Sequence, residues 1–294
     1  MTTLARLLPK LRPASGASSS YFQRCLSSSS AAASQSESQI PSHPLFFSAN
    51  LTRRDPKDRN LQWVFLGCPG VGKGTYASRL CNLLGVPHIA TGDLVRDELS
   101  SAGALSAQLK EIVNQGKLVS DEIILSLLWK RLEGGQDKGQ SGFILDGFPR
   151  TIKQAEILEG MIDIDLVVNL KLPEDILIEK CLGRRLCSQC GKNFNIASIN
   201  VKGENGNPAM SMAPLLPPEN CMSKLITRTD DTEEVVRERL RIYNDKTQPV
   251  EDFYRRRGKL LEFNLPGGIP ESWPKLLQVL DLDDYEDKQS AATA

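Results

Sequence analysis

The chain reads Gly67-Cys68-Pro69-Gly70-Val71-Gly72-Lys73-Gly74-Thr75 between a short apolar run and a helical pattern. Glycines let the backbone bend so that successive N–H groups face one anion, and the N-terminus of the following helix adds positive potential. Lys73 would reach the terminal phosphates of a bound nucleotide. The stretch departs from the usual phosphate-binding loop because Gly74 occupies the place of the Ser or Thr that binds magnesium. The motif predicts phosphate binding and does not by itself separate a kinase from a GTPase or a motor.

Apolar runs and helical patterns alternate on both sides of this loop. Strands are predicted at residues 61–66, 86–90, 143–145, 166–170 and 260–263, and helices at 75–84, 121–132, from 173, 231–256 and 272–280. Asp231 with Glu234 resembles a capping box that would open the fourth of these helices. The alternation predicts an α/β fold with a parallel sheet covered on both faces. Residues 186–226 break the pattern and indicate an inserted subdomain or lid.

Composition narrows the functional classes. The 294 residues include 40% hydrophobic and 24% charged residues, which is ordinary for a globular protein. Lys plus Arg and Asp plus Glu number 36 each, so no broad surface for nucleic acid is expected. No apolar run reaches 18 residues, so no membrane-spanning helix is expected. Seven cysteines in a chain of this length do not indicate a disulfide framework, and a reducing compartment is expected.

The first part of the chain, residues 1–50, differs from the rest. It is rich in serine, carries several basic residues, and has its first acidic residue at Glu37. This pattern is typical of an organelle transit peptide and linker, with a plain disordered tail as the alternative. The basic, amphipathic helical pattern that begins at Leu4–Leu8 favours mitochondrial localisation. Pro9, Pro13 and the excess of serine favour the plastid, and we therefore expect the chloroplast, with the mitochondrion as the alternative.

Five motifs follow one another along the chain. They are Gly72-Lys73-Gly74-Thr75, Thr91-Gly92-Asp93-Leu94-Val95-Arg96, Gly116-Lys117-Leu118-Val119-Ser120-Asp121, Asp146-Gly147-Phe148-Pro149-Arg150 and Arg228-Thr229-Asp230-Asp231. In this order and spacing they resemble the motifs of adenylate kinases, and the resemblance covers about residues 60–280. It implies a five-stranded parallel sheet wrapped by helices over residues 60–285. An insert that binds the nucleoside monophosphate (NMP) would span residues 90–119, a lid 183–231, and a C-terminal tail 286–294.

The resemblance also implies an activity, the reversible transfer of a phosphoryl group from ATP to AMP to give two ADP. Magnesium would accompany the ATP. Family members are often monomers, so we expect a monomer with ATP and AMP as partners and no nucleic-acid or membrane partner. Two alternatives remain open: a UMP/CMP kinase, and a nucleotide-binding relative with an impaired lid. Thr91 speaks against the first, because UMP/CMP kinases usually carry alanine there, and intact lid arginines speak against the second.

Residue roles follow from the same resemblance. The loop residues Gly70, Val71, Gly72, Lys73, Gly74 and Thr75 would bind ATP, together with Arg184 and Phe194 in the lid. Residues assigned to AMP are Thr91, Arg96, Lys117, Leu118, Val119, Gly147, Phe148, Pro149, Arg150, Gln154, Arg228 and Arg239. Guanidinium forks match phosphate oxygens, and an amide fits an adenine edge. Lys73, Arg184, Arg228 and Arg239 would act on the transferring phosphoryl group. Asp146, at the end of a strand, would hold magnesium through its waters.

The lid departs from the family pattern at two places. Many bacterial relatives bind zinc there through four ligands. Here Cys187, Cys190 and Cys221 would be followed by Lys224, which offers no donor electron pair when protonated. We therefore expect no zinc and reduced thiols, with a zinc site as the first alternative and a transient disulfide as the second. Lys180 stands where the family usually has an arginine that stacks on the ATP adenine, and this change could weaken ATP binding.

Overall fold

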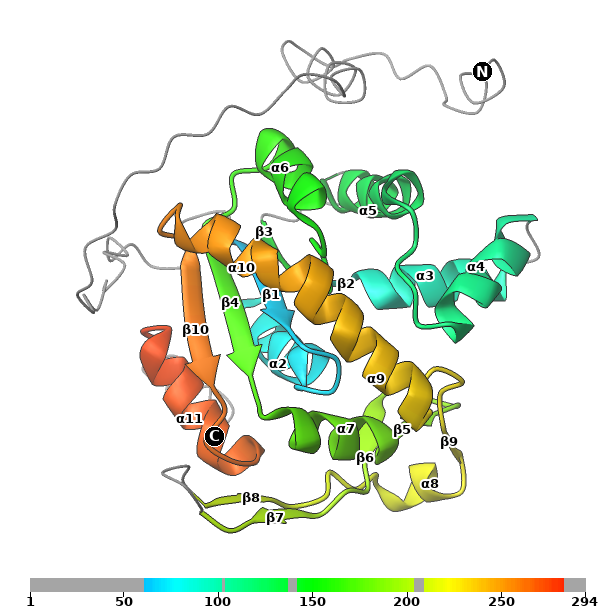
Figure 1. The fold of residues 1–294 in the computed structure, drawn as a ribbon, viewed down its shortest axis with the longest axis vertical. Helices are drawn as coiled ribbons and strands as arrows, with labels where there is room; N and C mark the ends of the chain where they lie inside the picture. Colours follow the sequence, from blue (N-terminus) through cyan, green and yellow to red (C-terminus); the bar gives the residue numbers. More distant parts are fainter. Residues whose placement is uncertain (1–60, 102–103, 137–141, 204–208, 283–294) are drawn as a thin grey trace.

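A five-stranded parallel sheet forms the centre of the molecule, in the strand order β10–β4–β1–β3–β2 (Figure 1). Its strands are β1 (Leu61–Gly67), β2 (His88–Ala90), β3 (Gly142–Asp146), β4 (Leu166–Lys171) and β10 (Leu260–Asn264). The computed structural model describes residues 61–101, 104–136, 142–203 and 209–282. The predicted α/β fold and its five-stranded parallel sheet are confirmed. The predicted transit peptide lies outside the described residues.

The central strand β1 is buried on both faces because its side chains alternate between two hydrophobic clusters. Trp63 and Phe65 belong to one cluster, while Val64 and Leu66 belong to the other. Successive side chains of a strand point to opposite faces of the sheet. A continuous apolar run is therefore what a strand covered by helices on both sides needs.

Helices cover both faces of the sheet. The first cluster receives apolar side chains from α2 (Lys73–Leu84), α7 (Glu174–Leu182), α9 (Glu233–Ile242) and α11 (Ile269–Val279). The second receives them from α5 (Asp121–Gln136), α6 (Ile152–Met161) and α10 (Gln248–Arg255). Among the residues that the structure describes, no helix is both long and apolar enough to cross a membrane.

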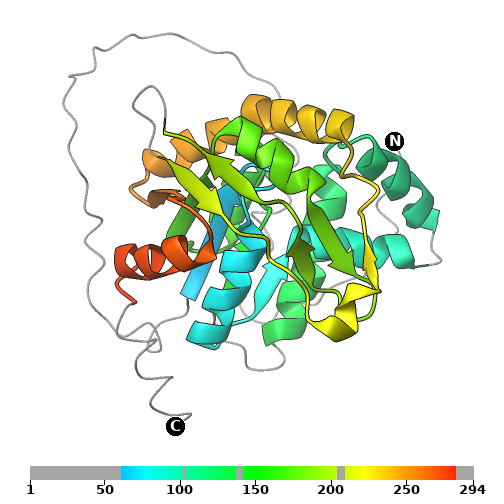
Figure 2. The same cartoon turned by 90° about the horizontal axis from the view of Figure 1, so that it is seen from below.

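Two groups of elements are inserted into this core. Helices α3 (Thr91–Ser100) and α4 (Ala104–Asn114) follow β2 and extend to the right in Figure 1. The second group contains β5 (Arg184–Cys187), β6 (Asn193–Asn195), β7 (Ile199–Val201), β8 (Met210–Met212), α8 (Glu219–Met222) and β9 (Leu225–Ile226). Strands β6, β5 and β9 form a small antiparallel sheet, and β7 pairs with β8. This second group gathers below the carboxyl ends of the central strands in Figure 1 and stands in front of the core in Figure 2.

The predicted capping box at Asp231 is wrong. Helix α9 is capped by Thr232, whose side chain accepts a hydrogen bond from the backbone N–H of Val235. The Asp231 carboxylate instead pairs with the guanidinium of Arg184, a partner from β5 that no local pattern could reveal.

The long helix predicted up to Arg256 is interrupted. Helix α9 ends at Ile242, a π-helical turn η3 (Tyr243–Thr247) follows, and α10 then runs to Arg255. Pro249 lies in the first turn of α10, and because proline has no N–H it cannot donate the hydrogen bond that would continue a regular α-helix. The chain changes its helical period just before that proline.

Burial on α6 predicts unequal costs for two similar substitutions. Leu158 is 1% exposed in the second cluster, whereas Ile152 on the same helix is 39% exposed. We expect Leu158→Ala to lower the free energy of unfolding by about 2–5 kcal/mol, because it removes buried methyl groups and leaves a cavity. Ile152→Ala should cost under about 1 kcal/mol. Urea unfolding of both variants measures the difference, and equal losses would contradict the packing described for α6.

Candidate active site

The phosphate loop adopts the conformation that its glycines allow. Gly70 has φ of 87° and Gly72 has φ of 104°, both in the left-handed region. A Cβ atom on Gly70 would lie 2.6 Å from the backbone oxygen of Leu177, so a larger residue would not fit. Helix α2 begins at Lys73 with Gly72 as its N-cap and no side-chain cap. The predicted loop thus presents a helix N-terminus, which is suited to an anion.

Lys73 is held inside the loop by its own backbone. Its ammonium group donates hydrogen bonds to the carbonyl oxygens of Gly67 at 2.7 Å and Cys68 at 3.0 Å. Burial lowers the pKa of Lys73 to about 8, against the opposing effect of the Asp146 carboxylate, and the positive charge of Arg150 lowers it further. A negative phosphate beside this ammonium group would favour its charged form.

Asp146 lies where the loop meets the end of β3. A Cβ atom on Gly74 would lie 3.3 Å from Oδ2 of Asp146, so a larger residue here would require a small shift of that carboxylate. The same oxygen lies 3.6 Å from Nε2 of His88, whose Nδ1 is 3.2 Å from Oγ of Ser78. Sequence analysis missed His88, although its place on a strand beside β3 could have suggested it. A carboxylate oxygen at this position fits the ligands that Mg²⁺ prefers, in company with waters and phosphate oxygens.

The turn after β3 carries the next group of predicted residues. Arg150 Nε donates to the carbonyl oxygen of Gly147 at 2.7 Å. Burial lowers the pKa of Arg150 to about 10, and the charge of Arg239 lowers it further. The Phe148 side chain is buried in the second cluster, so it anchors the turn to the core and does not line the pocket.

Gln154 and Thr91 are buried beside this turn and already have partners. The Gln154 amide oxygen accepts from the backbone N–H of Arg150, and its nitrogen donates to Oδ1 of Asp121, both at 2.7 Å. The Thr91 hydroxyl donates to the backbone oxygen of Asp146 at 3.2 Å. An amide has two donor hydrogens and two acceptor lone pairs, so Gln154 keeps one of each for a ligand.

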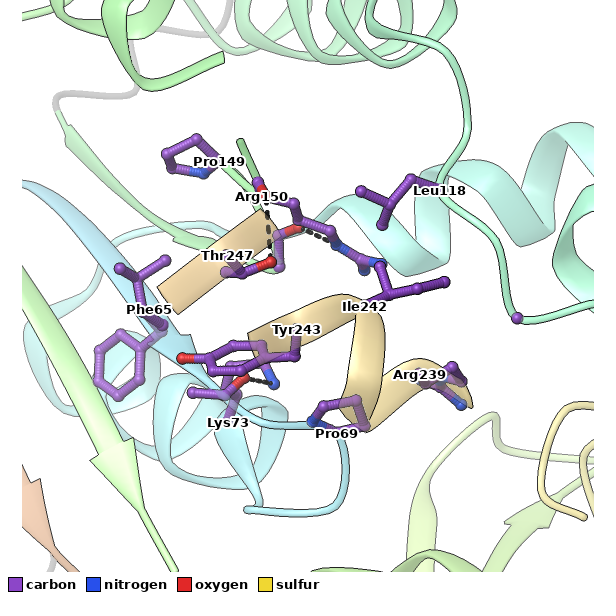
Figure 3. A pocket seen from close by; sticks show the side chains of 14 residues that line it. Phe65, Pro69, Lys73, Leu118, Pro149, Arg150, Arg239, Ile242, Tyr243 and Thr247 are labelled. Carbon is purple, nitrogen blue, oxygen red and sulfur yellow. Dashed lines mark hydrogen bonds between the residues drawn. The ribbon is translucent and has the colours of Figure 1, made fainter. Parts of the chain in front are cut away.

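A pocket joins three of the predicted segments. It is lined by loop residues that include Lys73, by the turn at Gly147 and Arg150, and by Leu118 and Arg239 (Figure 3). The remaining predicted site residues do not line it. These are Gly70, Val71, Gly72, Gly74, Thr75, Thr91, Arg96, Lys117, Val119, Asp146, Phe148, Gln154, Arg184, Phe194 and Arg228. The structure therefore brings residues of the phosphate loop, of the segment at 116–121 and of the turn at 146–150, together with Arg239, to a common pocket, and it leaves the other predicted residues outside the lining.

The π-helical turn forms a wall of this pocket that sequence analysis missed. Ile242, Tyr243 and Thr247 line the pocket. The Thr247 hydroxyl donates to the backbone oxygen of Arg150 at 3.0 Å. The Tyr243 hydroxyl donates to Oε1 of Glu251 at 2.8 Å. Widened helical turns often occur at functional sites, but the only sequence signal here was Pro249 after the turn.

Arginines at both ends of the inserted lid elements meet two aspartates. Arg184 forms a two-pronged pair with Asp231, whose side chain is 0% exposed. Burial opposes the charge of Arg184, but the hydrogen bonds that Arg184 donates to the Asp231 carboxylate outweigh this effect and raise the pKa of Arg184. Arg239 donates to Oδ2 of Asp230 at 2.8 Å. Sequence analysis quoted both aspartates in a motif without giving them this role.

Arg228 and Arg96 have partners outside the pocket. Arg228 donates from Nη2 to the side-chain oxygen of Asn193. Burial lowers the pKa of Arg228 to about 10, and the charge of Arg184 lowers it further. Arg96 pairs with Asp93 one helical turn before it, and its side chain is 37% exposed. Phe194 lies on β6 opposite Arg185, in the small lid sheet.

Three cysteines of the inserted elements converge in the structure. The Sγ atoms of Cys187, Cys190 and Cys221 all lie within 4.8 Å of one another. Lys224, at the place of a fourth ligand, donates from its ammonium group to the side-chain oxygen of Gln189. A hydrogen bond from the backbone of Cys190 lowers the pKa of Cys187 to about 7. Because a closed zinc site takes four donors and the described residues bring three, this set does not fit one.

Lys180 lies beside the phosphate loop. A Cβ atom on Gly72 would be 3.9 Å from its ammonium nitrogen, which is also 3.9 Å from the sulfur of Met212. Burial lowers the pKa of Lys180 to about 8. The substitution of lysine for the expected arginine thus places a compact, poorly solvated charge next to the loop.

Comparison with known proteins agrees with this geometry. The family model described as adenylate kinase matches residues 65–259. The chain is 70% identical over 263 residues to adenylate kinase 1, chloroplastic, from Arabidopsis thaliana, covering 90% of this chain and 92% of that protein. It is 76% identical over 239 residues to probable adenylate kinase 1, chloroplastic, from Oryza sativa subsp. japonica, covering 81% and 82%. It is 66% identical over 292 residues to adenylate kinase from Solanum tuberosum, covering 99% and 100%.

The incomplete cysteine set predicts a protein that does not need zinc. We expect the purified chain to hold less than one zinc per molecule and to keep its phosphotransfer activity in a strong chelator once magnesium is restored. Lys224→Cys supplies a fourth donor and should raise the stability of the lid when zinc is present. Metal analysis and limited proteolysis with and without chelator measure both effects. Stoichiometric zinc in the wild-type chain, with a lid that unfolds when zinc is removed, would contradict the prediction.

Proposed function

The chain belongs to the adenylate kinase family, and we propose how its residues carry out the family's reaction, the reversible transfer of a phosphoryl group from ATP to AMP that gives two ADP. It is a nucleoside monophosphate kinase, with ATP and AMP as substrates. Its relatives from Arabidopsis and rice are named chloroplastic, and the chain is a chloroplast protein like them. This outcome agrees with the serine-rich, acid-free leader rather than with the mitochondrial alternative.

The observation that carries the proposed site is the gathering of three cations, Lys73, Arg150 and Arg239, around one pocket. Burial is the main cause that lowers the pKa of Lys73 and of Arg150, and neighbouring cations add to it. Arg150 and Arg239 lower the pKa of Lys73, and Arg239 and Arg96 lower that of Arg150. Arg184 and Arg96 do the same to Arg228. Repulsion between clustered cations costs stability in the free protein, and a bound anion with several negative charges relieves it. The polyphosphate of ATP facing the phosphate of AMP is an anion of that kind.

At the donor end, the phosphate loop and Lys73 would hold the β- and γ-phosphates of ATP. Lys73 would exchange its bonds to the loop carbonyls for bonds to the phosphate oxygens as the phosphoryl group moves. Asp146 would hold Mg²⁺ through water, and Mg²⁺ when bound supplies positive charge to the phosphate oxygens. Phosphoryl transfer needs alignment and positive charge more than covalent help, so no covalent enzyme intermediate is proposed.

At the acceptor end, Arg96 and Arg150 would hold the phosphate of AMP. The backbone at Lys117, Leu118 and Val119 would border the base and ribose. Arg96 would leave its exposed pairing with Asp93, which costs little because exposed ion pairs contribute about 0–1 kcal/mol. The free donor and acceptor of Gln154 are proposed to meet the adenine edge, with Thr91 holding the turn at Asp146 beside it.

Closure of the insert at residues 183–231 would complete the site. Arg184 and Arg228 lie on this insert, and Arg239 lies on α9 just after it. In the described arrangement Arg184 is paired with Asp231 and Arg228 with Asn193, so closure would redirect guanidinium groups toward the transferring phosphoryl group. It would also exclude the water that would otherwise hydrolyse ATP. Phe194 is proposed to approach ATP in the same movement. We propose a monomer as the working unit.

The first test of this site concerns Lys73. Lys73→Ala should remove nearly all phosphotransfer while the fold is retained, because the charge matters most as the phosphoryl group moves. Lys275→Ala, at an exposed position on α11, serves as the matched control and should leave kcat unchanged. A coupled assay of ADP formation and circular dichroism measure activity and fold. A folded Lys73→Ala variant that keeps more than about a tenth of kcat, a loss under roughly 1.4 kcal/mol, would remove Lys73 from the proposed role.

The second test concerns the choice of acceptor. AMP should be preferred over UMP, CMP and GMP, because buried groups arranged for one base are left unpaired by another. Thr91→Ala should weaken this preference, while Thr227→Ala, at an exposed position, should not change it. The values of kcat/KM for the four monophosphates provide the measurement. Equal values for AMP and CMP in the wild-type chain would contradict the proposed acceptor site while leaving the kinase assignment intact.

A further inference from the structure

The lid holds a group of thiols that the phosphotransfer reaction does not use. Cys187 ends β5, Cys190 lies in the turn between β5 and β6, and Cys221 lies on α8. The sulfurs of Cys190 and Cys221 are 3.7 Å apart. Cys190 is exposed, while Cys187 and Cys221 are buried. One sulfur is therefore open to solvent and lies in contact with a second that comes from a distant part of the lid.

Backbone hydrogen bonds hold the two segments in this position without help from sulfur. The N–H of Gly191 donates to the carbonyl oxygen of Cys187 at 2.9 Å. In the segment that contains Cys221, the N–H of Lys224 donates to the carbonyl oxygen of Cys221 at 3.0 Å. The N–H of Ser188 donates to the carbonyl oxygen of Lys224 at 2.9 Å, and this bond links the two segments. A disulfide bond is about 2.05 Å long. The two sulfurs could therefore join after side-chain rotation in the exposed turn.

The other cysteines in the described part of the chain are less exposed than Cys190. Cys81 and Cys181 are buried and Cys68 is partly buried. Burial raises the pKa of Cys68 to about 11 and that of Cys81 to about 12, and it also raises the pKa of Cys181. Because the thiolate is the reactive form, these three thiols are poor nucleophiles. A hydrogen bond with Cys187 raises the pKa of Cys221 to about 11 as well, and Cys221 differs from these three because its sulfur lies in contact with that of the exposed Cys190. Thiol chemistry is thus concentrated in the lid.

We propose that Cys190 and Cys221 form a reversible disulfide by exchange with a small-molecule disulfide such as glutathione disulfide. In the first step the Cys190 thiolate attacks one sulfur of glutathione disulfide, whose S–S bond breaks and releases one glutathione thiolate. In the second step the Cys221 thiolate attacks Sγ of Cys190 and releases the second glutathione. The two cysteines lose two protons and two electrons, and glutathione disulfide becomes two glutathione thiols. Excess reduced glutathione reverses both steps.

The disulfide would close a covalent loop around most of the lid. Residues 190–221 include β6, β7, β8 and most of α8. A cross-link restricts the open and unfolded arrangements of the segment it closes, and it gains more when that segment is long. The oxidised lid should therefore open locally less often than the reduced lid. This site modifies the lid and does not depend on the residue roles proposed for phosphotransfer.

The experiment uses the full chain in glutathione buffers of increasing oxidised fraction. Free thiols are alkylated, and mass spectrometry of the digested protein identifies the linked peptides. We expect a Cys190–Cys221 cross-link that dithiothreitol reverses, with cleavage in the lid by a limiting protease slowed by at least about threefold. Cys190→Ser, at an exposed position that should not disturb folding, should lose both effects. Cys187→Ser should retain the cross-link.

Three results would overturn the proposal. The first is glutathione attached to Cys190 without a cross-link. The second is a cross-link between Cys187 and Cys190 in place of Cys190–Cys221, which would make the chemistry local to one turn. The third is protection of all three thiols from alkylation by tightly bound zinc that persists through oxidation. Because the linked peptides are identified in the wild-type chain, each result can be read even if a variant at a buried cysteine folds poorly.

Discussion

Repulsion between positive charges held partly out of water is the constraint on which the rest of this structure depends. Lys73, Arg150 and Arg228 are each opposed by burial and by a neighbouring cation. Three carboxylates, those of Asp146, Asp230 and Asp231, provide the opposing charge. These groups come from the phosphate loop, the end of β3, the lid and the start of α9. The site therefore exists only when the whole core has formed, because its cations come from segments far apart in the sequence, although Asp146 with Arg150 and Arg228 with Asp230 are close in sequence.

The core supplies the rigidity that this arrangement needs. The central strand sends alternate side chains into two hydrophobic clusters, so neither face of the sheet is free to shift. The site lies at the carboxyl ends of the parallel strands, where the loop, the turn at Gly147 and the inserted elements meet (Figure 1). The inserted elements thus lie against a rigid, helix-covered sheet. In the proposed mechanism the chemistry would be shared between the core, which holds Lys73 and Arg150, and the inserted elements, which carry Arg96 and Arg184, and the segment with Arg228.

Local patterns predicted the sheet well because most of its strands are largely apolar runs whose side chains are buried in the core. They failed where the deciding partner is far away in sequence. Asp231 looks like a helix cap, yet its carboxylate is taken by Arg184 on β5. The Gln154 amide was expected to be free for a base, but Arg150 and Asp121 already use half of its hydrogen-bonding capacity. The motifs located the candidate site residues, and the contacts that link those residues had to come from the folded chain.

The bonds between Lys73 and its own loop have a consequence for how binding energy should be understood. In the described structure two of the three N–H donors of the ammonium group are already used by the carbonyl oxygens of Gly67 and Cys68. A phosphate that reaches Lys73 replaces these partners instead of meeting an unsolvated group. The number of hydrogen bonds at the ammonium group is nearly conserved when phosphate binds. The net binding enthalpy of this contact is therefore a small difference between the hydrogen bonds lost to the carbonyl oxygens and those gained to the phosphate. In the proposed mechanism the loop carbonyl oxygens would solvate the ammonium group until oxygens of the transferring phosphoryl group replace them.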